Sequence, residues 1–328
     1  MPGTAADGFE SATTLIGGGI ESSGEIMAAH GTTYIGIDWG ASIRRAYVIS
    51  PQGELVREHE DEEGSQRVTG RFQDALATLL DALEIEHADV IISGMAGSRE
   101  GWKEVPFLAL QHPLRRLGEA LVPIDTGLPG VRARIVPGYR YVDPHGAPDI
   151  MRGEETHVLG ALELGADGGW FLLPGAHSRW VHVNGGRITE FITFMTGELY
   201  ALLARHGSLA TIISSQDSVA EAFANGLRAA RQGGLIHAAF CCRAMVLTDM
   251  MLSSHAGSYL SGLLIGSELF EIVRKSGDAM SQPVQVIGST GVMARYLSAL
   301  ELLGIPARAW QPGNTFAAAL RTLFDIRG

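Results

Sequence analysis

The sequence predicts an α/β fold of two similar domains that face each other across a cleft. One order of elements occurs twice: a meander of three strands, then helix, strand, helix, strand, helix. Each meander turns after its first strand at a glycine–alanine pair, Gly40-Ala41 and then Gly175-Ala176, and enters its second strand through an arginine. A repeated unit of this size indicates two domains of one kind, with each glycine turn pointing into the cleft.

The elements of the first half follow from short apolar runs and from helical periodicity. Runs rich in β-branched and aromatic residues end at turn residues, which is typical of strands. The helix at 69–83 is predicted because Phe72, Leu76, Leu79, Leu80 and Leu83 recur on one face. The predicted elements are strands at 34–38, 45–49, 54–60, 90–93 and 134–136, and helices at 69–83 and 152–164.

The second half starts the pattern again with a buried strand. Asn184-Gly185 is a strong hairpin signal between the second and third strands of this meander, because both residues accept a positive φ. The predicted elements are strands at 170–173, 179–183, 187–194, 284–287 and 307–310, and helices at 219–231, 259–275, 293–303 and 315–324.

The domain boundaries are placed from composition and from the repeat. Residues 1–32 are rich in Gly, Ala, Ser and Thr, and they have neither the basic start nor the apolar centre of a signal peptide. We expect a disordered N-terminal extension there, and Met27 offers an alternative translation start. The two lobes are expected at 33–138 and 139–328, with the helix at 152–164 at the crossover.

The composition of the chain limits the classes of partner that it is expected to bind. The formal net charge of -11 argues against nucleic acid, which calls for a basic face. No apolar run is long enough to predict a membrane span. The two cysteines are adjacent, Cys241 and Cys242, which is unsuited to a disulfide and indicates a reducing, cytoplasmic compartment. The sequence leaves the oligomeric state open, and a homodimer is compatible with it.

Two facing glycine turns suit phosphoryl transfer. Glycine lets backbone N–H groups approach a polyphosphate, so one turn from each domain can hold the phosphates of ATP from opposite sides. Asp38 ends the first strand, where its carboxylate can hold Mg²⁺ through water. Positioning and charge neutralisation carry most of phosphoryl-transfer catalysis, and closure of two domains excludes competing water.

Asp38 and each glycine turn also have a purely structural interpretation, as parts of ordinary turns. Asp-x-Gly after a strand is common, and Asp38 would then only cap the turn that follows it. The chain has no G-x-x-x-x-G-K-[ST] signature, and the run Gly17-Gly18-Gly19 follows no strand. The duplication is therefore the observation that favours the nucleotide site.

Several distinctive segments lie between Tyr34 and the C-terminus. They are Ile37–Gly40, Gly94–Ser98 with Gly101-Trp102 and Pro106, Val136–Gly138, Met151–Thr156, Leu173–Gly175 with His177 and Trp180-Val181, Met195–Leu199, Ser261–Gly266 and Ala294–Tyr296. Together these segments resemble one family, the 2-dehydro-3-deoxygalactonokinases. The resemblance implies an actin-like ATPase (ribonuclease H-like) fold and transfer of the γ-phosphate of ATP to the 6-hydroxyl of 2-dehydro-3-deoxy-D-galactonate, in galactonate catabolism.

The chain departs from the family pattern in both glycine turns. The family has two hydroxyl residues after Asp-Trp-Gly, where this chain has Ala41 and Ser42. The family has Pro-Gly-Thr-His in the second turn, where this chain has Ala176 in place of threonine. Each turn loses one hydroxyl that could contact phosphate. Because backbone donors and Ser42 remain, we expect a weakened site that still functions.

The resemblance implies the roles of individual residues. Related sugar kinases place a catalytic carboxylate at the start of the crossover helix, so Glu154 or Glu155 is expected to be the general base, and spacing does not separate them. The other glutamate would be a plain helix-start charge. Residues that would contact ATP are Gly40, Ser42 and Arg45, then Gly175, Ala176 and His177, and for the adenosine Gly288, Ser289, Thr290 and Gly291.

The substrate is a 2-oxo acid, and its carboxylate needs a cationic or N–H-rich seat. Candidates are Ser98, Arg99, Trp102 and Arg152. Arg99 could equally be a solvated surface charge, Trp102 a core residue, and His177 a residue packed beside its turn. The 288–291 segment could equally be an ordinary strand-to-helix turn.

Two alternative functions stay open from the sequence. One is a kinase of the same fold that acts on another sugar or sugar acid. The other is a catalytically weakened sugar-acid-binding protein, which Ala41 and Ala176 keep in consideration. An ADP-release assay with a panel of sugar acids and sugars would distinguish the first alternative from the expected kinase. Binding of a sugar acid without turnover would identify the second alternative.

Overall fold

The computed structural model describes residues 33–215, 217–277, 280 and 282–326. The expectations for residues 1–32, including the start at Met27, lie outside the described residues.

The first sheet has six strands in the order β3-β2-β1-β4-β7-β6, with an antiparallel meander on one side and parallel pairs β1–β4 and β4–β7. Its strands are β1 (Thr33–Trp39), β2 (Arg44–Ile49), β3 (Leu55–Asp61), β4 (Ala88–Gly94), β6 (Val122–Ile124) and β7 (Val131–Ile135).

The second sheet repeats this arrangement with five strands. Its order is β12-β11-β10-β13-β14, again an antiparallel meander followed by parallel pairs β10–β13 and β13–β14. The duplicated α/β fold predicted from the sequence is confirmed by the shared strand order of the two sheets. The strands are β10 (Gly169–Leu173), β11 (Ser178–Asn184), β12 (Arg187–Phe194), β13 (Val284–Ile287) and β14 (Ala307–Trp310).

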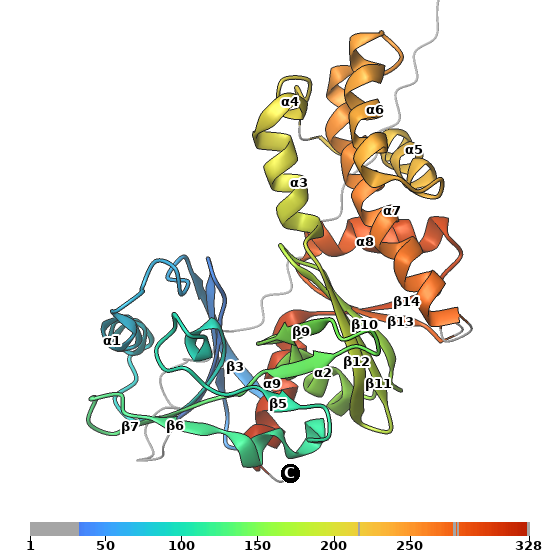
Figure 1. Cartoon of the computed structure of the whole chain (residues 1–328). Helices are drawn as coiled ribbons and strands as arrows, with labels where there is room; N and C mark the ends of the chain where they lie inside the picture. Colours follow the sequence, from blue (N-terminus) through green and yellow to red (C-terminus); the bar gives the residue numbers. More distant parts are fainter. Residues whose placement is uncertain (1–32, 216, 278–279, 281, 327–328) are drawn as a thin grey trace, which may run out of the picture. The chain divides into compact units, whose positions relative to one another are not determined.

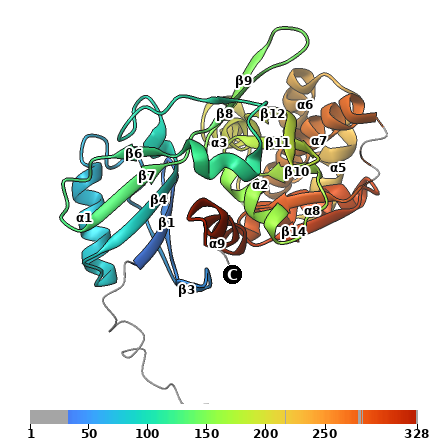
Figure 2. The same ribbon diagram turned by 90° about the horizontal axis from the view of Figure 1, so that it is seen from below.

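Two helices lie between the sheets, α2 (Glu154–Glu163) and α9 (Pro312–Leu323) (Figures 1 and 2). They pack against each other, and α9 also contacts β1 and β2. One buried cluster takes residues from the first sheet, from both helices and from the second sheet, for example Tyr47, Val158, Phe316 and Phe171. Gly36 leaves room for this contact, because a Cβ there would lie 2.4 Å from Leu320.

The other face of each sheet carries its own helices. In the first, α1 (Phe72–Leu83) buries its apolar stripe on Ile35 and Ile37 of β1. In the second, residues of α5, α7 and α8 cover Trp170 and Leu172 of β10. Figure 1 shows α3, α5 and α6 gathered around α7. These helices are α3 (Thr196–Arg205), α4 (Gly207–Ala210), α5 (Ala220–Ala230), α6 (Leu235–Leu247), α7 (Ala256–Ser276) and α8 (Thr290–Leu302).

A small third sheet precedes α2 in the chain. Its strands β5 (Leu108–Ala109), β8 (Tyr139–Val142) and β9 (Pro148–Met151) pair in the order β5-β8-β9. The Asp149 carboxylate of β9 accepts hydrogen bonds from the backbone N–H (2.7 Å) and the Oγ1 (2.8 Å) of Thr193 on β12. The segment that leads into α2 is thereby attached to the second sheet. The division of the chain into lobes at 138 and 139 stays a prediction.

The structure corrects several element boundaries. The helix expected from residue 69 begins at Phe72, because Thr69 donates its hydroxyl to the Ser65 carbonyl in a turn that precedes the helix. The helix expected at 152–164 spans Glu154–Glu163. The helix expected from 315 already begins at Pro312, since proline is favoured in the first helical turn. Within the described residues, no helix is both long and apolar enough to cross a membrane.

Candidate active site

The start of α2 lies against the carboxyl ends of β1 and β4. In the parallel register of these strands, Asp38 is opposite Ser93 and Trp39 is opposite Gly94. Gly153 precedes α2 with φ 111°, a backbone conformation that favours glycine, and a Cβ on it would lie 3.3 Å from the Gly94 Cα. This close approach brings the two glutamates that open α2 to the edge of the sheet where Asp38 lies.

Asp38 contacts residues of α2 and β2. Its Oδ2 lies 3.5 Å from Nε2 of His157 and 4.0 Å from Nη1 of Arg45, and its side chain is 18% exposed. The other ring nitrogen of His157, Nδ1, lies 3.0 Å from Oγ1 of Thr315 on α9. The Thr315 hydroxyl also lies 2.9 Å from the Pro312 carbonyl, and its single hydrogen can be donated either to that carbonyl or to Nδ1 of His157. The Nε2 atom of His157 faces the Asp38 carboxylate.

Glu154 and Glu155 are adjacent but differ in environment. The Glu154 side chain is 22% exposed, accepts a 3.0 Å hydrogen bond from the Arg152 backbone N–H, and lies 3.5 Å from Nε of Arg179 on β11. Glu155 is fully buried, and its two carboxylate oxygens face the Gly153 N–H at 3.0 and 2.9 Å. Only Glu154 is open to a ligand.

Burial is the main influence on Glu155. Burial and, to a smaller extent, the charge of Glu154 raise the pKa of this carboxyl from its ordinary value of 4.5 to about 8, although the Gly153 N–H and Arg152 act against the shift. The Oγ1 of Thr156 and the Oγ of Ser93 lie 3.4 and 3.5 Å from Oε1, and these two hydroxyls are 2.7 Å apart. Glu155 therefore belongs to a buried polar cluster that fixes the start of α2 on β4.

The first glycine turn, residues 40–42, is held by the loop between β3 and α1. The backbone N–H groups of Ser65 and Gln66 donate to the carbonyls of Gly40 (2.9 Å) and Ala41 (3.1 Å). A Cβ on Gly64 would lie 2.3 Å from the Ser42 carbonyl carbon, so the loop presses directly on the turn. Ser42 itself is exposed.

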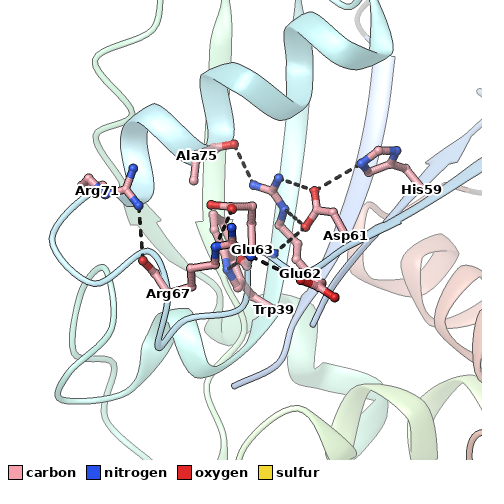
Figure 3. A network of polar contacts seen from close by, with 9 residues as sticks. Trp39, His59, Asp61, Glu62, Glu63, Arg67, Arg71 and Ala75 are labelled. Carbon is pink, nitrogen blue, oxygen red and sulfur yellow. Dashed lines mark hydrogen bonds and ion pairs between the residues drawn. The ribbon is translucent and has the colours of Figure 1, made fainter. Parts of the chain in front are cut away.

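The buried side chain of Arg44 anchors this loop through Asp61 and Ala75, which Figure 3 labels. Arg44 is 2% exposed, donates to the Ala75 carbonyl of α1 (2.7 Å), and forms two hydrogen bonds with the Asp61 carboxylate, of 3.2 and 2.6 Å. Asp61 also accepts a bond from the Glu63 N–H, and the Glu63 carbonyl accepts one from the Trp39 indole. The Arg44 guanidinium lowers the pKa of Asp61 against the effect of burial. This network ties β1, β2, β3 and α1 together beside the turn.

The second glycine turn is held in a similar way by α3. A Cβ on Gly197 would lie 2.3 Å from the Gly175 carbonyl oxygen, and the Glu198 N–H donates to the Ala176 carbonyl (2.9 Å). His177 lies 2.6 Å from the Glu198 carboxylate and is partly exposed. Arg179, which approaches Glu154, also donates to the His177 carbonyl (3.3 Å). Through these contacts the second turn meets the start of α2.

A pocket of about 260 Å³ opens beside the second turn. Most residues that line it have no role predicted from the sequence, although the family segments 195–199, 261–266 and 294–296 contain many of them. Of the predicted adenosine segment 288–291, none lines the pocket, but Val292, which follows it on α8, does. Residues that line the pocket are Gly175 and Ala176, then Thr196, Gly197 and Tyr200 of α3, Ser261, Leu264 and Ile265 of α7, and Val292, Arg295 and Tyr296 of α8.

The predicted substrate residues separate into two groups. Arg152 donates from Nη2 to the Val105 carbonyl (2.7 Å) and stacks over Phe107, while its buried Nη1 has no hydrogen-bond partner among the described residues. A Cβ on Gly97 would lie 2.8 Å from that Nη1, so the loop that contains Ser98 lies beside it. Trp102 packs on Trp39 and Phe72, as the core interpretation expects, and Arg99 is exposed.

The arrangement of strands, turns and polar residues agrees with one family. A family model described as 2-keto-3-deoxy-galactonokinase matches residues 38–323. The chain belongs to this family. The resemblance inferred from the sequence segments is thereby confirmed, and the chain is a carbohydrate kinase that transfers phosphate to an alcohol group.

Bacterial members of this family cover nearly the whole described chain. A protein of Rhizobium meliloti strain 1021 named as a probable 2-dehydro-3-deoxygalactonokinase is 34% identical over 301 residues, 88% of this chain and 95% of that protein. The 2-dehydro-3-deoxygalactonokinase of Escherichia coli K12 is 31% identical over 295 residues, 88% and 97%. A crystal structure from Sinorhizobium meliloti, described provisionally as the same kinase, superposes with a TM-score of 0.80 at 33% identity and covers 89% and 95%.

Asp38 fits a magnesium ion that is held largely by other groups. Within the described residues, no cluster of three or more His, Cys, Asp or Glu side chains could hold a metal ion. Magnesium in phosphate-transferring sites commonly uses one or two carboxylates, with water and substrate phosphates as the remaining ligands. A single, partly exposed carboxylate beside a glycine turn meets that requirement.

Proposed function

We propose that this chain uses ATP and Mg²⁺ to phosphorylate 2-dehydro-3-deoxy-D-galactonate at its 6-hydroxyl, as a cytoplasmic step of galactonate catabolism. One observation carries the proposal. The start of α2 brings a partly exposed carboxylate, Glu154, to the sheet edge where Asp38 lies, and links it through Arg179 to the second glycine turn. Family membership supplies the substrate class.

Nucleotide would be held by both turns and by the pocket. The phosphates would lie between the backbone of residues 40–42 and that of Gly175 and Ala176, with Arg45 near the first turn. The adenosine would enter the 260 Å³ pocket between α3, α7 and α8, close to the 288–291 segment. Asp38 would hold Mg²⁺, which when bound neutralises charge on the phosphates.

Glu154 is the residue that we assign as general base. A base must reach the hydroxyl proton of the substrate, which requires an exposed carboxylate oxygen. Glu154 meets this condition and Glu155, which is enclosed, does not. Glu155 instead fixes the helix start through Gly153 and Ser93, so that the Glu154 carboxylate keeps its position.

The carboxylate of the sugar acid would bind Arg152. Its buried Nη1 lacks a partner among the described residues, and burial lowers the pKa of this guanidinium, which an anionic partner would counteract. Ser98 lies on the loop beside Arg152. This assignment leaves Arg99 at the surface, and Trp102 supports the loop through Trp39.

A coupled ADP-release assay tests the proposal. The chain should release ADP with 2-dehydro-3-deoxygalactonate, more slowly with the gluconate epimer, and not at all with the 6-deoxy analogue. Phosphorus NMR of the product should show a phosphate ester on carbon 6. Turnover of the 6-deoxy analogue would contradict the assigned hydroxyl, and binding of the acid without ADP release would contradict catalysis.

A further inference from the structure

A buried carboxylate lies behind the pocket at the second glycine turn. Glu268 of α7 is 2% exposed, and its Oε1 accepts a 2.7 Å hydrogen bond from Nε1 of Trp180 on β11. Its Oε2 accepts one from the Tyr296 hydroxyl of α8 (2.8 Å) and another from the Thr196 hydroxyl of α3. One side chain therefore joins four elements that meet around the pocket.

Two of these three donors line the pocket themselves. Thr196 is the first residue of α3 and Tyr296 lies on α8, so the bonds to Glu268 set the distance between two of the pocket walls. Thr196 also precedes the two residues that hold the second turn. Gly197 lies against the Gly175 carbonyl, and the Glu198 N–H bonds to Ala176. A displacement of Thr196 would therefore move the turn as well.

The chemistry of this cluster suits a carboxylate. The indole and the two hydroxyls all donate, and a carboxylate offers only acceptors. Burial raises the pKa of Glu268, and the hydrogen bonds from Thr196, Trp180 and Tyr296 lower it. Among the described residues, only neutral donors bond to Glu268. A buried carboxylate of this kind contributes little stability compared with a well-packed apolar residue. The presence of a carboxylate here is explained by the fixed arrangement that it gives to Trp180, Thr196 and Tyr296.

We propose that Glu268 is a positioning residue for nucleotide, which holds the base pocket and the Gly175-Ala176 turn in one arrangement. This inference rests on the proposed function for the identity of the bound nucleotide. It does not depend on which sugar acid is the substrate. Glu268 would act only through Thr196 and Tyr296, because it is enclosed behind them.

The Glu268→Gln variant tests the proposal directly. Its amide nitrogen must face either the Trp180 indole or the two hydroxyls, so at least one hydrogen bond is lost or reversed. We expect the Kd for ADP, measured by calorimetry, and the KM for ATP each to rise about tenfold, as loss of a buried hydrogen bond implies. The KM for the sugar acid should stay within about twofold, because the contacts of Arg152 are untouched.

Two further variants keep Glu268, and each removes one of the hydroxyls that bond to it. Thr196→Val and Tyr296→Phe preserve shape and should raise the same two nucleotide constants, so the test does not depend on the folding of Glu268→Gln. Asp89→Asn is the matched control. Asp89 is a largely buried carboxylate of β4, bonded to Arg132 and Arg134 at 3.1 Å each, and it does not line the pocket. Its loss should lower the melting temperature without changing the Kd for ADP.

The outcomes separate this inference from the proposed function. A lower melting temperature with unchanged ADP affinity in all three pocket variants would overturn the role of Glu268. So would an equal loss of affinity for ADP and for the sugar acid, which would indicate general damage. A wild-type chain that binds ADP but phosphorylates neither sugar acid would contradict the proposed substrate alone. A wild-type chain that binds no ADP would overturn both.

Discussion

At the scale of single residues, the two glutamates that open α2 have opposite environments. Glu154 is partly exposed beside Arg179, whereas Glu155 is buried in hydrogen bonds to Gly153 and close to Ser93 and Thr156. The peptide geometry of a helix start places neighbouring side chains on different faces, about 100° apart around the axis. One carboxylate is therefore partly exposed and the other is enclosed by the protein.

This difference predicts separate effects of two conservative substitutions. Glu154→Gln should lower kcat by roughly 10²–10⁴-fold, the range for loss of a general base, with little change in the KM for ATP. Glu155→Gln should retain more activity, because burial raises the pKa of this carboxyl to about 8 and the neutral amide resembles its protonated form. ADP release measures both, with circular dichroism as the control for folding. A larger loss in Glu155→Gln would reverse the assignment.

Glu155 also predicts a dependence of stability on pH. The folded chain keeps a proton up to a pKa of about 8 that the unfolded chain releases near 4.5, so the folded state binds more protons between these values. Stability from this group is complete below about pH 4.5 and is lost as the pH rises through about 8. As the pH rises through this window, the free energy of unfolding of wild type should fall relative to that of Glu155→Gln by on the order of 1 kcal/mol per pH unit. Parallel urea-denaturation curves across this range would contradict it.

At the scale of elements, each glycine turn is supported by the segment that follows its meander. The loop between β3 and α1 presses Gly64 on Ser42, and the start of α3 presses Gly197 on Gly175. The two lobes thus use the same device at corresponding places. Support of this kind lets a turn present its backbone in one conformation although it has few side chains of its own.

A methyl group at the first of these contacts should displace the turn. In Gly64→Ala the added Cβ would lie 2.3 Å from the Ser42 carbonyl carbon, so backbone atoms must move. We expect the KM for ATP to rise about tenfold, equivalent to ~1.4 kcal/mol. In the control, Gly118→Ala, the nearest atom would be 3.4 Å away, and the KM should not change. Equal kinetics in the two variants would show that the loop does not position the turn.

The sequence predicted the elements whose signals are local. Apolar runs and turn residues gave both meanders, and Asp38 and the glycine turns follow directly from the ends of their strands. The pocket could not be predicted in this way, because Thr196, Ser261 and Arg295 lie on three helices that meet only in the folded chain. Strand β9 was also missed, since its sequence Pro148–Met151 follows a turn and pairs only with β8. The roles assigned to the site residues stay predictions.

At the scale of the whole molecule, α9 packs against β1, the first described strand, from which it is far separated in the sequence. Leu320 and Phe316 of this helix pack over Gly36 of β1, and Phe316 stacks on Tyr47 of β2. The same helix packs against α2 and contributes Thr315 to the His157 side chain near Asp38. The cluster around α2 and α9 is shared by both sheets, so we expect the two lobes to unfold together.

A substitution in this shared cluster should therefore affect both lobes. Leu320 is fully buried, and Leu320→Ala should reduce the free energy of unfolding by about 2–5 kcal/mol, while Leu320→Met should cost less than about 1.5 kcal/mol. The fluorescence of Trp39 and Trp102 in the first lobe and of Trp170 and Trp180 in the second should change in one transition. Two separated transitions in the wild-type chain would show that α9 does not couple them.

The position of α9 also has a consequence during biosynthesis. A ribosome makes β1 and β2 long before α9, so the apolar surface of the first sheet around Gly36 and Tyr47 stays uncovered until α9 has been synthesised. The nascent first lobe would then be a natural client for chaperones. A stop codon introduced before residue 312 should give a truncated product that aggregates or is degraded, even when that product contains every residue of the first sheet.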